Sequence, residues 1–157
     1  YEGDKYCHLA FLNSRIASYY IKVLTPKLTI SATYICKIPV VKGILNDTIL
    51  SGGSQDIVKL KDSYNSKRPI NYEYKVDEFI KYNSVYEYAK RDFVNDLELE
   101  VKRLRFEKDI NERIFKYYDF SNEEIDYIYS KVGANPYDID DKTIVLSVNE
   151  LDKSIEK

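Results

Sequence analysis

The feature that most constrains the fold is a long amphipathic stretch that starts at Ser84. Ser84 and Glu87 form a capping box, in which a hydroxyl and a carboxylate each satisfy a free amide at a helix start. Apolar residues then recur at three- and four-residue spacing, at Tyr86, Ala89, Phe93, Leu97, Val101, Leu104, Ile110, Ile114 and Tyr117 or Tyr118. We expect a helix over 84–118, on the order of 50 Å long at ~1.5 Å per residue, that serves as a spacer.

Two more capping boxes follow this stretch. Ser121 with Glu124 predicts a short helix over 122–131, and Ser147 with Glu150 predicts a helix from 148 that is cut off at Lys157. Residues 84–157 are therefore interpreted as a helical spacer. The chain begins at Tyr1, contains no Met and ends inside a predicted helix, so we expect a fragment of a larger protein.

The N-terminal part predicts one helix followed by one strand. Helical spacing of apolar residues over 7–24 predicts a core-facing helix through Leu9, Leu12, Ile16, Tyr20 and Val23 or Leu24. Pro26 cannot continue the helical hydrogen bonds and should end it near Leu24. Beyond Pro26, alternation of apolar with hydroxyl residues predicts a half-buried strand over 28–38, and Pro39 limits that strand to an edge or an end.

Residues 44–83 are predicted to be irregular. Ser51-Gly52-Gly53-Ser54 is typical of a turn or flexible loop, and 56–61 of a short strand or helical turn. The stretch is also the most basic one, so it is either a phosphate-contacting loop or an exposed, solvated loop. The predicted fold class is thus α+β and helix-rich: a helix-plus-strand unit over 1–43, an irregular basic region over 44–83, and the helical spacer.

Composition restricts the partners. Lys+Arg 24 against Asp+Glu 26 gives a formal net charge of −2, so a nucleic-acid surface has to be a local patch. No apolar run approaches the ~20 residues of a membrane span and no signal-peptide order is present, so we expect a cytoplasmic protein without membrane contact. Cys7 and Cys36 are predicted to be reduced structural thiols, and His8 to be structural.

Three short patterns follow one another in the N-terminal part of the chain: Leu12-Asn13-Ser14, Thr25-Pro26, and Lys37-Ile38-Pro39-Val40. Together they are similar to the target-recognition region of adenine-specific DNA methyltransferases, and they imply its recognition role for the unit over 1–43. The type IIG restriction-modification and BREX (PglX-like) phage-resistance groups typically show a Leu-Leu-Asn-Ser helix, an Asn-Pro or Ser-Pro break, an extended segment and an Ile-Pro-Ile/Val close. Asn111-Glu112-Arg113-Ile114-Phe115 with Tyr117-Tyr118 resembles the end of their long helix, although Tyr118-Asp119-Phe120 replaces the usual Tyr-Gly-Leu.

The resemblance implies a non-catalytic role in DNA target recognition. The partners would be double-stranded DNA and an upstream methyltransferase domain of the same chain, which would supply S-adenosylmethionine; no cofactor is expected in this fragment. Small hydroxyls and basic side chains suit phosphate and base-edge contacts, although the hydroxyls could equally face water or pack on a neighbouring strand. The residues expected to contact DNA are Thr25, Lys27, Thr29, Ser31, Thr33, Lys37, Lys42, Lys59, Lys61, Lys67 and Arg68.

No catalytic constellation is predicted in the chain itself. Ala134-Asn135-Pro136-Tyr137 is close to the Asn-Pro-Pro-Tyr loop of amino-methyltransferases but lacks one proline and follows a helix, so we interpret it as a turn. Asp138, Asp140, Asp141 and Glu150 lack the spacing of a calcium loop and are interpreted as a solvated surface. Two alternative functions remain open: part of a type I restriction specificity subunit, and a helical protein-interaction module that does not bind DNA.

Overall fold

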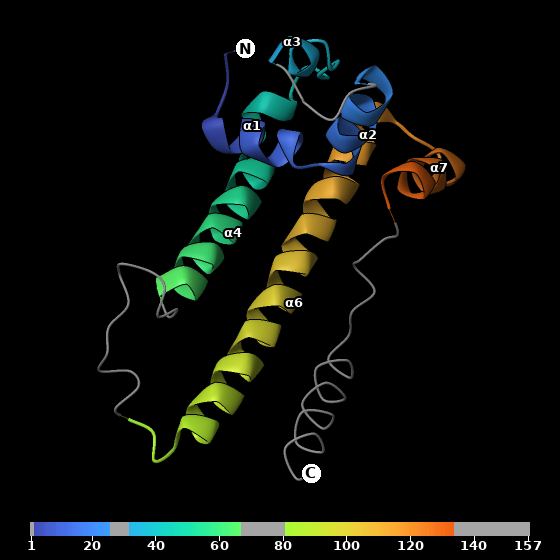
Figure 1. Cartoon of the computed structure of the whole chain (residues 1–157). Helices are drawn as coiled ribbons and strands as arrows, with labels where there is room; N and C mark the ends of the chain where they lie inside the picture. Colours follow the sequence, from blue (N-terminus) through green and yellow to red (C-terminus); the bar gives the residue numbers. More distant parts are fainter. Residues whose placement is uncertain (1, 26–31, 67–80, 134–157) are drawn as a thin grey trace. The chain divides into compact units, whose positions relative to one another are not determined.

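A computed structural model describes residues 2–25, 32–66 and 81–133 (Figure 1). Its helices are α1 (Lys5–Leu12), α2 (Arg15–Leu24), α3 (Ala32–Ile35), the 3₁₀ turn η1 (Ile44–Asn46), α4 (Thr48–Ser66), α6 (Val85–Tyr118) and α7 (Asn122–Val132). They belong to two compact units. The described part of unit 1 is 2–25, 32–56 and 106–133, and that of unit 2 is 57–66 and 81–105.

The predicted α+β class is wrong, because every regular element in these ranges is helical. The described part of the expected strand 28–38 holds α3, a single helical turn closed by a hydrogen bond from Cys36 N to Ala32 O. Residues 28–31 lie outside the described residues. Alternation over so short a run does not separate a strand from a helical turn, and a strand also needs a partner strand, which the described ranges do not contain.

The single helix predicted over 7–24 is two helices, because Asn13 and Ser14 interrupt it. Asn13 ends α1, where both its backbone N and its side-chain Nδ2 donate to Leu9 O. Ser14 begins α2 in an extended conformation, and its Oγ accepts from Ala17 N. Side chains of this kind compete with the helical backbone and favour helix ends. The expected end of the helix at Leu24 is confirmed.

The break also changes which side chains are buried. Leu9 and Leu12 are expected in the core from their spacing but are 40% and 42% exposed, and of the two alternatives Val23 and Leu24, Val23 is exposed and Leu24 is half-buried. Unit 1 instead buries the apolar side chains of several helices and of the segment before α4: Cys7, Ala10, Phe11, Ile16, Ala17, Ile38, Ile44, Leu50, Ile110, Ile114, Phe115 and Ile128. The core of unit 1 is therefore built from contacts among segments far apart in the sequence.

The expected irregular region is wrong for residues 48–66, which form α4 through the Gly52-Gly53 pair. The two glycines differ in surroundings. A Cβ on Gly53 would lie 3.3 Å from Ile110 Cγ1 of α6, whereas a Cβ on Gly52 would meet nothing within 4 Å. Gly53 thus allows a close approach of α4 to α6 within unit 1, and the packing gained there offsets the low helix propensity of glycine.

We expect opposite effects from replacing these two glycines. Gly52→Ala should raise the free energy of unfolding by about 0.5–1 kcal/mol, because alanine is the better helix former and the space is open. Gly53→Leu should lower it by roughly 1–2 kcal/mol through overpacking against Ile110. Urea unfolding followed by circular dichroism measures both. Equal effects of the two variants would contradict the assigned packing.

The helices expected over 84–118 and 122–131 are present as α6 and α7. Ser84 Oγ accepts from Glu87 N at 3.1 Å at the start of α6. The box of Ser121 and Glu124 is complete, with both the side-chain and the reciprocal backbone hydrogen bond formed. The helix expected from 148 lies outside the described residues. In the part of the chain that is described, no helix has the length and apolar character needed to span a membrane.

Candidate nucleic-acid interface

Unit 1 is organised around the buried carboxylate of Asp47, which precedes α4. Its Oδ1 accepts from Ile49 N at 2.8 Å and Leu50 N at 3.1 Å, so it caps that helix. Its Oδ2 accepts from Arg113 Nε at 2.6 Å and from the Tyr117 hydroxyl at 2.5 Å, both on α6. We call Asp47, Arg113 and Tyr117 the Asp47 cluster. It joins two helices of the unit through one carboxylate.

The surroundings keep this carboxylate ionised. Burial of the side chain, which is 2% exposed, would by itself raise its pKa. The hydrogen bonds donated by Tyr117, Arg113, and the Leu50 and Ile49 amides outweigh burial and lower the pKa of Asp47 from 3.8 to about 2. Asp47 is therefore a fixed negative charge, fully compensated within unit 1, and acts as a structural anchor.

A second acidic cap connects α1 to the start of α4. Asp4 Oδ1 accepts from Tyr6 N and Cys7 N at the start of α1 and from Ser51 Oγ of α4 at 2.9 Å. The Ser51 hydroxyl contributes most to holding the pKa of Asp4 below its usual value. Cys7 Sγ donates to Asp47 O at 3.1 Å, and burial raises the pKa of the Cys7 thiol. Cys7 thus belongs to the packing, as a protonated thiol.

Asn111 of α6 caps the start of α2. Its side chain is 3% exposed; Oδ1 accepts from Arg15 N at 2.7 Å, and Nδ2 donates to Glu107 O at 2.7 Å. Arg15 N is one of the amides at the start of α2 that lack a partner inside that helix. Asn111 therefore fixes the point at which α1 and α2 separate.

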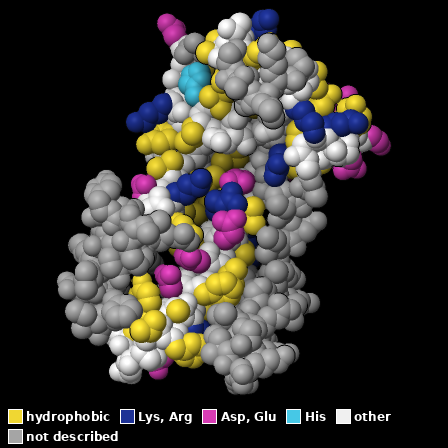
Figure 2. All heavy atoms as spheres, viewed as in Figure 1, with side chains coloured by type: hydrophobic (Ala, Val, Ile, Leu, Met, Phe, Trp, Pro, Cys, Tyr) yellow, Lys and Arg dark blue, Asp and Glu magenta, His cyan; other side chains and the backbone are white. Residues whose placement is uncertain are grey.

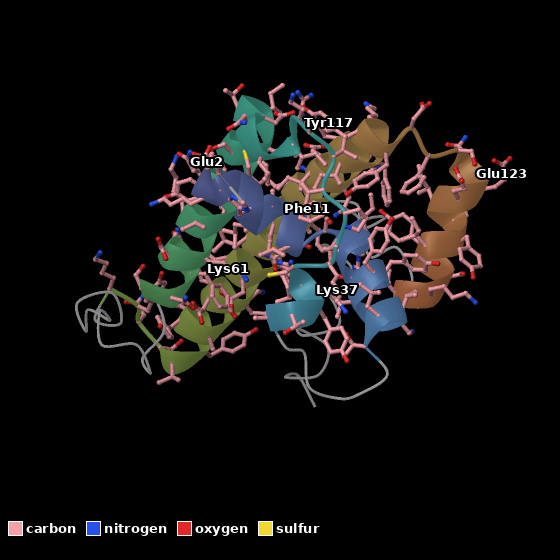
Figure 3. All side chains as sticks on the ribbon, turned by 90° about the horizontal axis from the view of Figure 1, so that it is seen from above. Glu2, Phe11, Lys37, Lys61, Tyr117 and Glu123 are labelled. Atoms are coloured by element: carbon pink, nitrogen blue, oxygen red, sulfur yellow. The ribbon has the colours of Figure 1, made fainter. Side chains whose placement is uncertain are left out.

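Two hydrogen bonds connect α6 to segments far away in the sequence. Asn111 Oδ1 accepts from the backbone N of Arg15, which follows Leu12-Asn13-Ser14, and Tyr118 at the end of α6 donates its hydroxyl to Pro39 O. Burial raises the pKa of Tyr118 to about 12. Figure 3 shows Phe11 on α1 and Tyr117 on α6, which belong to the same unit.

Asp119 follows α6 with φ 52° and is the one described non-glycine residue with positive φ. This left-handed conformation favours glycine, with Asp and Asn as the tolerated exceptions. Asp119 occupies the middle position of Tyr118-Asp119-Phe120, where the resembled proteins carry Tyr-Gly-Leu. The departure from that pattern is therefore conservative in backbone terms.

The described residues of the predicted contact set are divided between the two units. Thr25, Thr33, Lys37 and Lys42 belong to unit 1, while Lys59 and Lys61 are exposed on α4 in unit 2. Thr33 is exposed on α3 and does not share a strand face with its neighbours. The structure does not describe Lys27, Thr29, Ser31, Lys67 or Arg68.

The side chains of these contact residues differ in their exposure to solvent. Lys37 and Lys42 are exposed, and Lys37 Nζ lies 5.9 Å from the centre of the Tyr34 ring. Figure 3 shows Lys37 just after α3. Thr25 ends α2, and its Oγ1 is enclosed and has no hydrogen-bond partner among the described residues. In this conformation Thr25 does not offer its hydroxyl to a ligand.

The charges along the chain form a pattern that the predicted contact set does not include. From Lys5 to Asn46 the chain contains no Asp or Glu, and its cations are Lys5, Arg15, Lys22, Lys27, Lys37 and Lys42. Figure 2 shows Lys and Arg side chains at several points around α1, α2 and α3, with Asp and Glu side chains near them. The near-neutral total charge conceals this acid-free run, which a charge count over short windows of the sequence would have found.

Unit 2 contains a groove of about 610 Å³ between α4 and α6. Its lining is apolar at Leu60, Phe93 and Leu97, with an ion pair between Glu100 and Arg103. The hydrogen bond from Arg103 holds the pKa of Glu100 below its usual value. No group of three His, Cys, Asp or Glu side chains suited to a metal ion occurs within the described ranges.

The comparisons with known proteins give no relative. No family model matches the chain, and neither a curated protein nor a solved structure matches it.

Proposed function

We propose that the chain is a non-catalytic target-recognition and spacer part of an adenine-specific DNA methyltransferase of a restriction or phage-defence system. The observation that carries the proposal is the acid-free run from Lys5 to Asn46, whose exposed Lys37 and Lys42 belong to the unit that also contains the resembling motifs. The exposed lysines of this run would provide the counterion-releasing contacts on which DNA affinity depends.

Two further observations support this proposal. Pro39 and Tyr118, which belong to two of the separated motifs, contact each other, and Asn111 of the last motif accepts from Arg15, the residue after Leu12-Asn13-Ser14. Asp119 adopts the backbone conformation that the glycine of the resembled pattern favours. In the proposed role, an upstream domain of the same chain binds S-adenosylmethionine and receives the flipped adenine, and the protein acts in the cytoplasm on double-stranded DNA.

A second candidate is a helical protein-interaction module. Apolar side chains exposed on α6 in unit 2 favour it, since Val85 is 69%, Tyr86 42% and Phe93 37% exposed. A module of this kind would bind a protein partner through α6 and would show no affinity for a DNA duplex.

Duplex binding as a function of salt separates the two functions. The chain should bind a duplex at low salt and lose affinity steeply as salt rises. Lys37→Ala and Lys42→Ala should each reduce the slope of log K against log salt by about 1. Lys116→Ala is the matched control, because Lys116 is exposed in the same unit but has Glu112 and Asp119 on adjacent turns. Absence of binding at low salt would refute the DNA function.

A further inference from the structure

Helices α2 and α7 of unit 1 bring two lysines and two tyrosines together. Lys22 Nζ donates to Lys131 O, and the Tyr19 and Tyr127 rings meet edge to face with centroids 6.2 Å apart. Lys131 Nζ lies 4.9 Å from the centre of the Tyr127 ring. Lys22, Tyr127 and Lys131 are all exposed, and Tyr127 is 53% exposed. We call these three residues the α2–α7 surface.

Helix C-termini explain only part of this arrangement. Lys22 and Lys131 each lie in the last turn of their helix, where a cation stabilises the carbonyl end. That role does not require a half-exposed tyrosine under the Lys131 ammonium. It also leaves protons of both ammonium groups available, because the hydrogen bond to Lys131 O uses one proton of Lys22.

The two ammonium groups suit an anionic partner at this surface. Helix α2 carries Arg15 and Lys22 and no acidic residue. Helix α7 carries three acidic residues: Glu123 and Glu124 lie in its first turn, where Figure 3 shows Glu123, and Asp126 directly precedes Tyr127, whereas Lys131 lies in its last turn. Lysine ammonium groups are typical contacts to the sugar-phosphate backbone of a duplex.

We propose that Lys22, Lys131 and Tyr127 form a second DNA contact, one that binds backbone phosphates and adds affinity without sequence preference. The inference rests on the proposed function, because it assigns a further surface to the same ligand. The Tyr127 ring orients the Lys131 ammonium by a cation–π contact, and Lys22 joins this ammonium from the neighbouring helix. Because the bound group is phosphate, the surface should bind either strand of a duplex of any sequence.

The test is duplex binding by the double variant Lys22→Gln/Lys131→Gln at several salt concentrations. Loss of two phosphate contacts should reduce the slope of log K against log salt by about 2 and weaken binding by roughly tenfold in low salt. The loss should be similar for two unrelated duplex sequences. Tyr127→Phe should bind as the unchanged chain does, and Tyr127→Ala should bind about threefold more weakly.

Lys116→Gln is the control, and thermal unfolding of each variant separates binding from stability. A double variant with a lower Tm and the slope of the control would show that the two lysines only stabilise helix ends, and the inference would fail while the proposed function stands. The inference would fail in the same way if only the Lys37 and Lys42 variants weakened binding. If the unchanged chain binds a single strand or a protein and no duplex, the proposed function and this inference both fail.

Discussion

Asp47→Asn is expected to lower the free energy of unfolding by about 2 kcal/mol at pH 7 and by almost nothing near pH 2. Asparagine keeps an oxygen for the Ile49 and Leu50 amides, so α4 keeps its cap. It removes the charge that Arg113 and Tyr117 contact. A folded-state pKa of about 2 against 3.8 for the ordinary group corresponds to about 2 kcal/mol.

The direction of the pH dependence follows from the lowered pKa. Between about pH 4 and pH 2 the unfolded chain takes up a proton on Asp47 more readily than the folded chain does. Stability from this group is therefore fully present above pH 4 and is lost as the pH falls towards 2. The unchanged protein and Asp47→Asn should converge over that interval. Urea unfolding at pH 7, 5, 4 and 3 measures the convergence.

Asp109→Asn is the matched control for this experiment. Asp109 is an exposed carboxylate on α6 in the same unit, so its replacement should change stability by less than ~0.5 kcal/mol. A constant difference between Asp47→Asn and the unchanged protein at every pH would mean that the lost contact is not ionic. The assignment of an ionised carboxylate to Asp47 would then be wrong.

The long helices could be predicted because their signals are local. Ser84 and Ser121 each lie three residues before the glutamate of a capping box, and both helices start there. Pro26 likewise marks the end of α2 correctly. Each of these signals depends on residues within one helical turn of each other, so no knowledge of the packing is needed.

The secondary structure predicted from the sequence is wrong where residues far apart in the chain pack against each other. Gly53 lies inside a helix and close to Ile110 of α6, and Asp47, which caps α4, also contacts Arg113 of α6. Neither relation is visible in a window of sequence. The alternation after Pro26 predicts a strand, whereas the described part of that segment holds the turn of α3.

The sequence predicts which residue types the candidate interface contains, but it does not predict which of these residues are exposed or close together. Lys37 and Lys42 are predicted contacts and are exposed, while Thr25 is a predicted contact whose hydroxyl is enclosed. Lys22 and Lys131 escape a prediction from sequence because they are 109 positions apart and meet only through the packing of α2 on α7. Exposure and proximity are tertiary properties, so residue type alone could not rank these lysines.

Asn111→Ala is expected to lower the free energy of unfolding by about 2–3 kcal/mol. The substitution leaves the Arg15 amide without its acceptor at a partly buried helix start, and an unsatisfied buried donor costs about 1–3 kcal/mol. A small cavity adds to this cost, because the Asn111 side chain is 3% exposed. Denaturant unfolding of the variant provides the measurement.

Asn111→Asp separates the hydrogen bond from the volume of the side chain. A carboxylate keeps an acceptor for Arg15 N, and a negative charge is favourable at the start of α2. It loses the Nδ2 donor to Glu107 O, whose carbonyl also belongs to a helical ladder. We expect Asn111→Asp to retain at least half of the stability that alanine loses. If aspartate were as destabilising as alanine, the bond to Arg15 N would not be what fixes the start of α2.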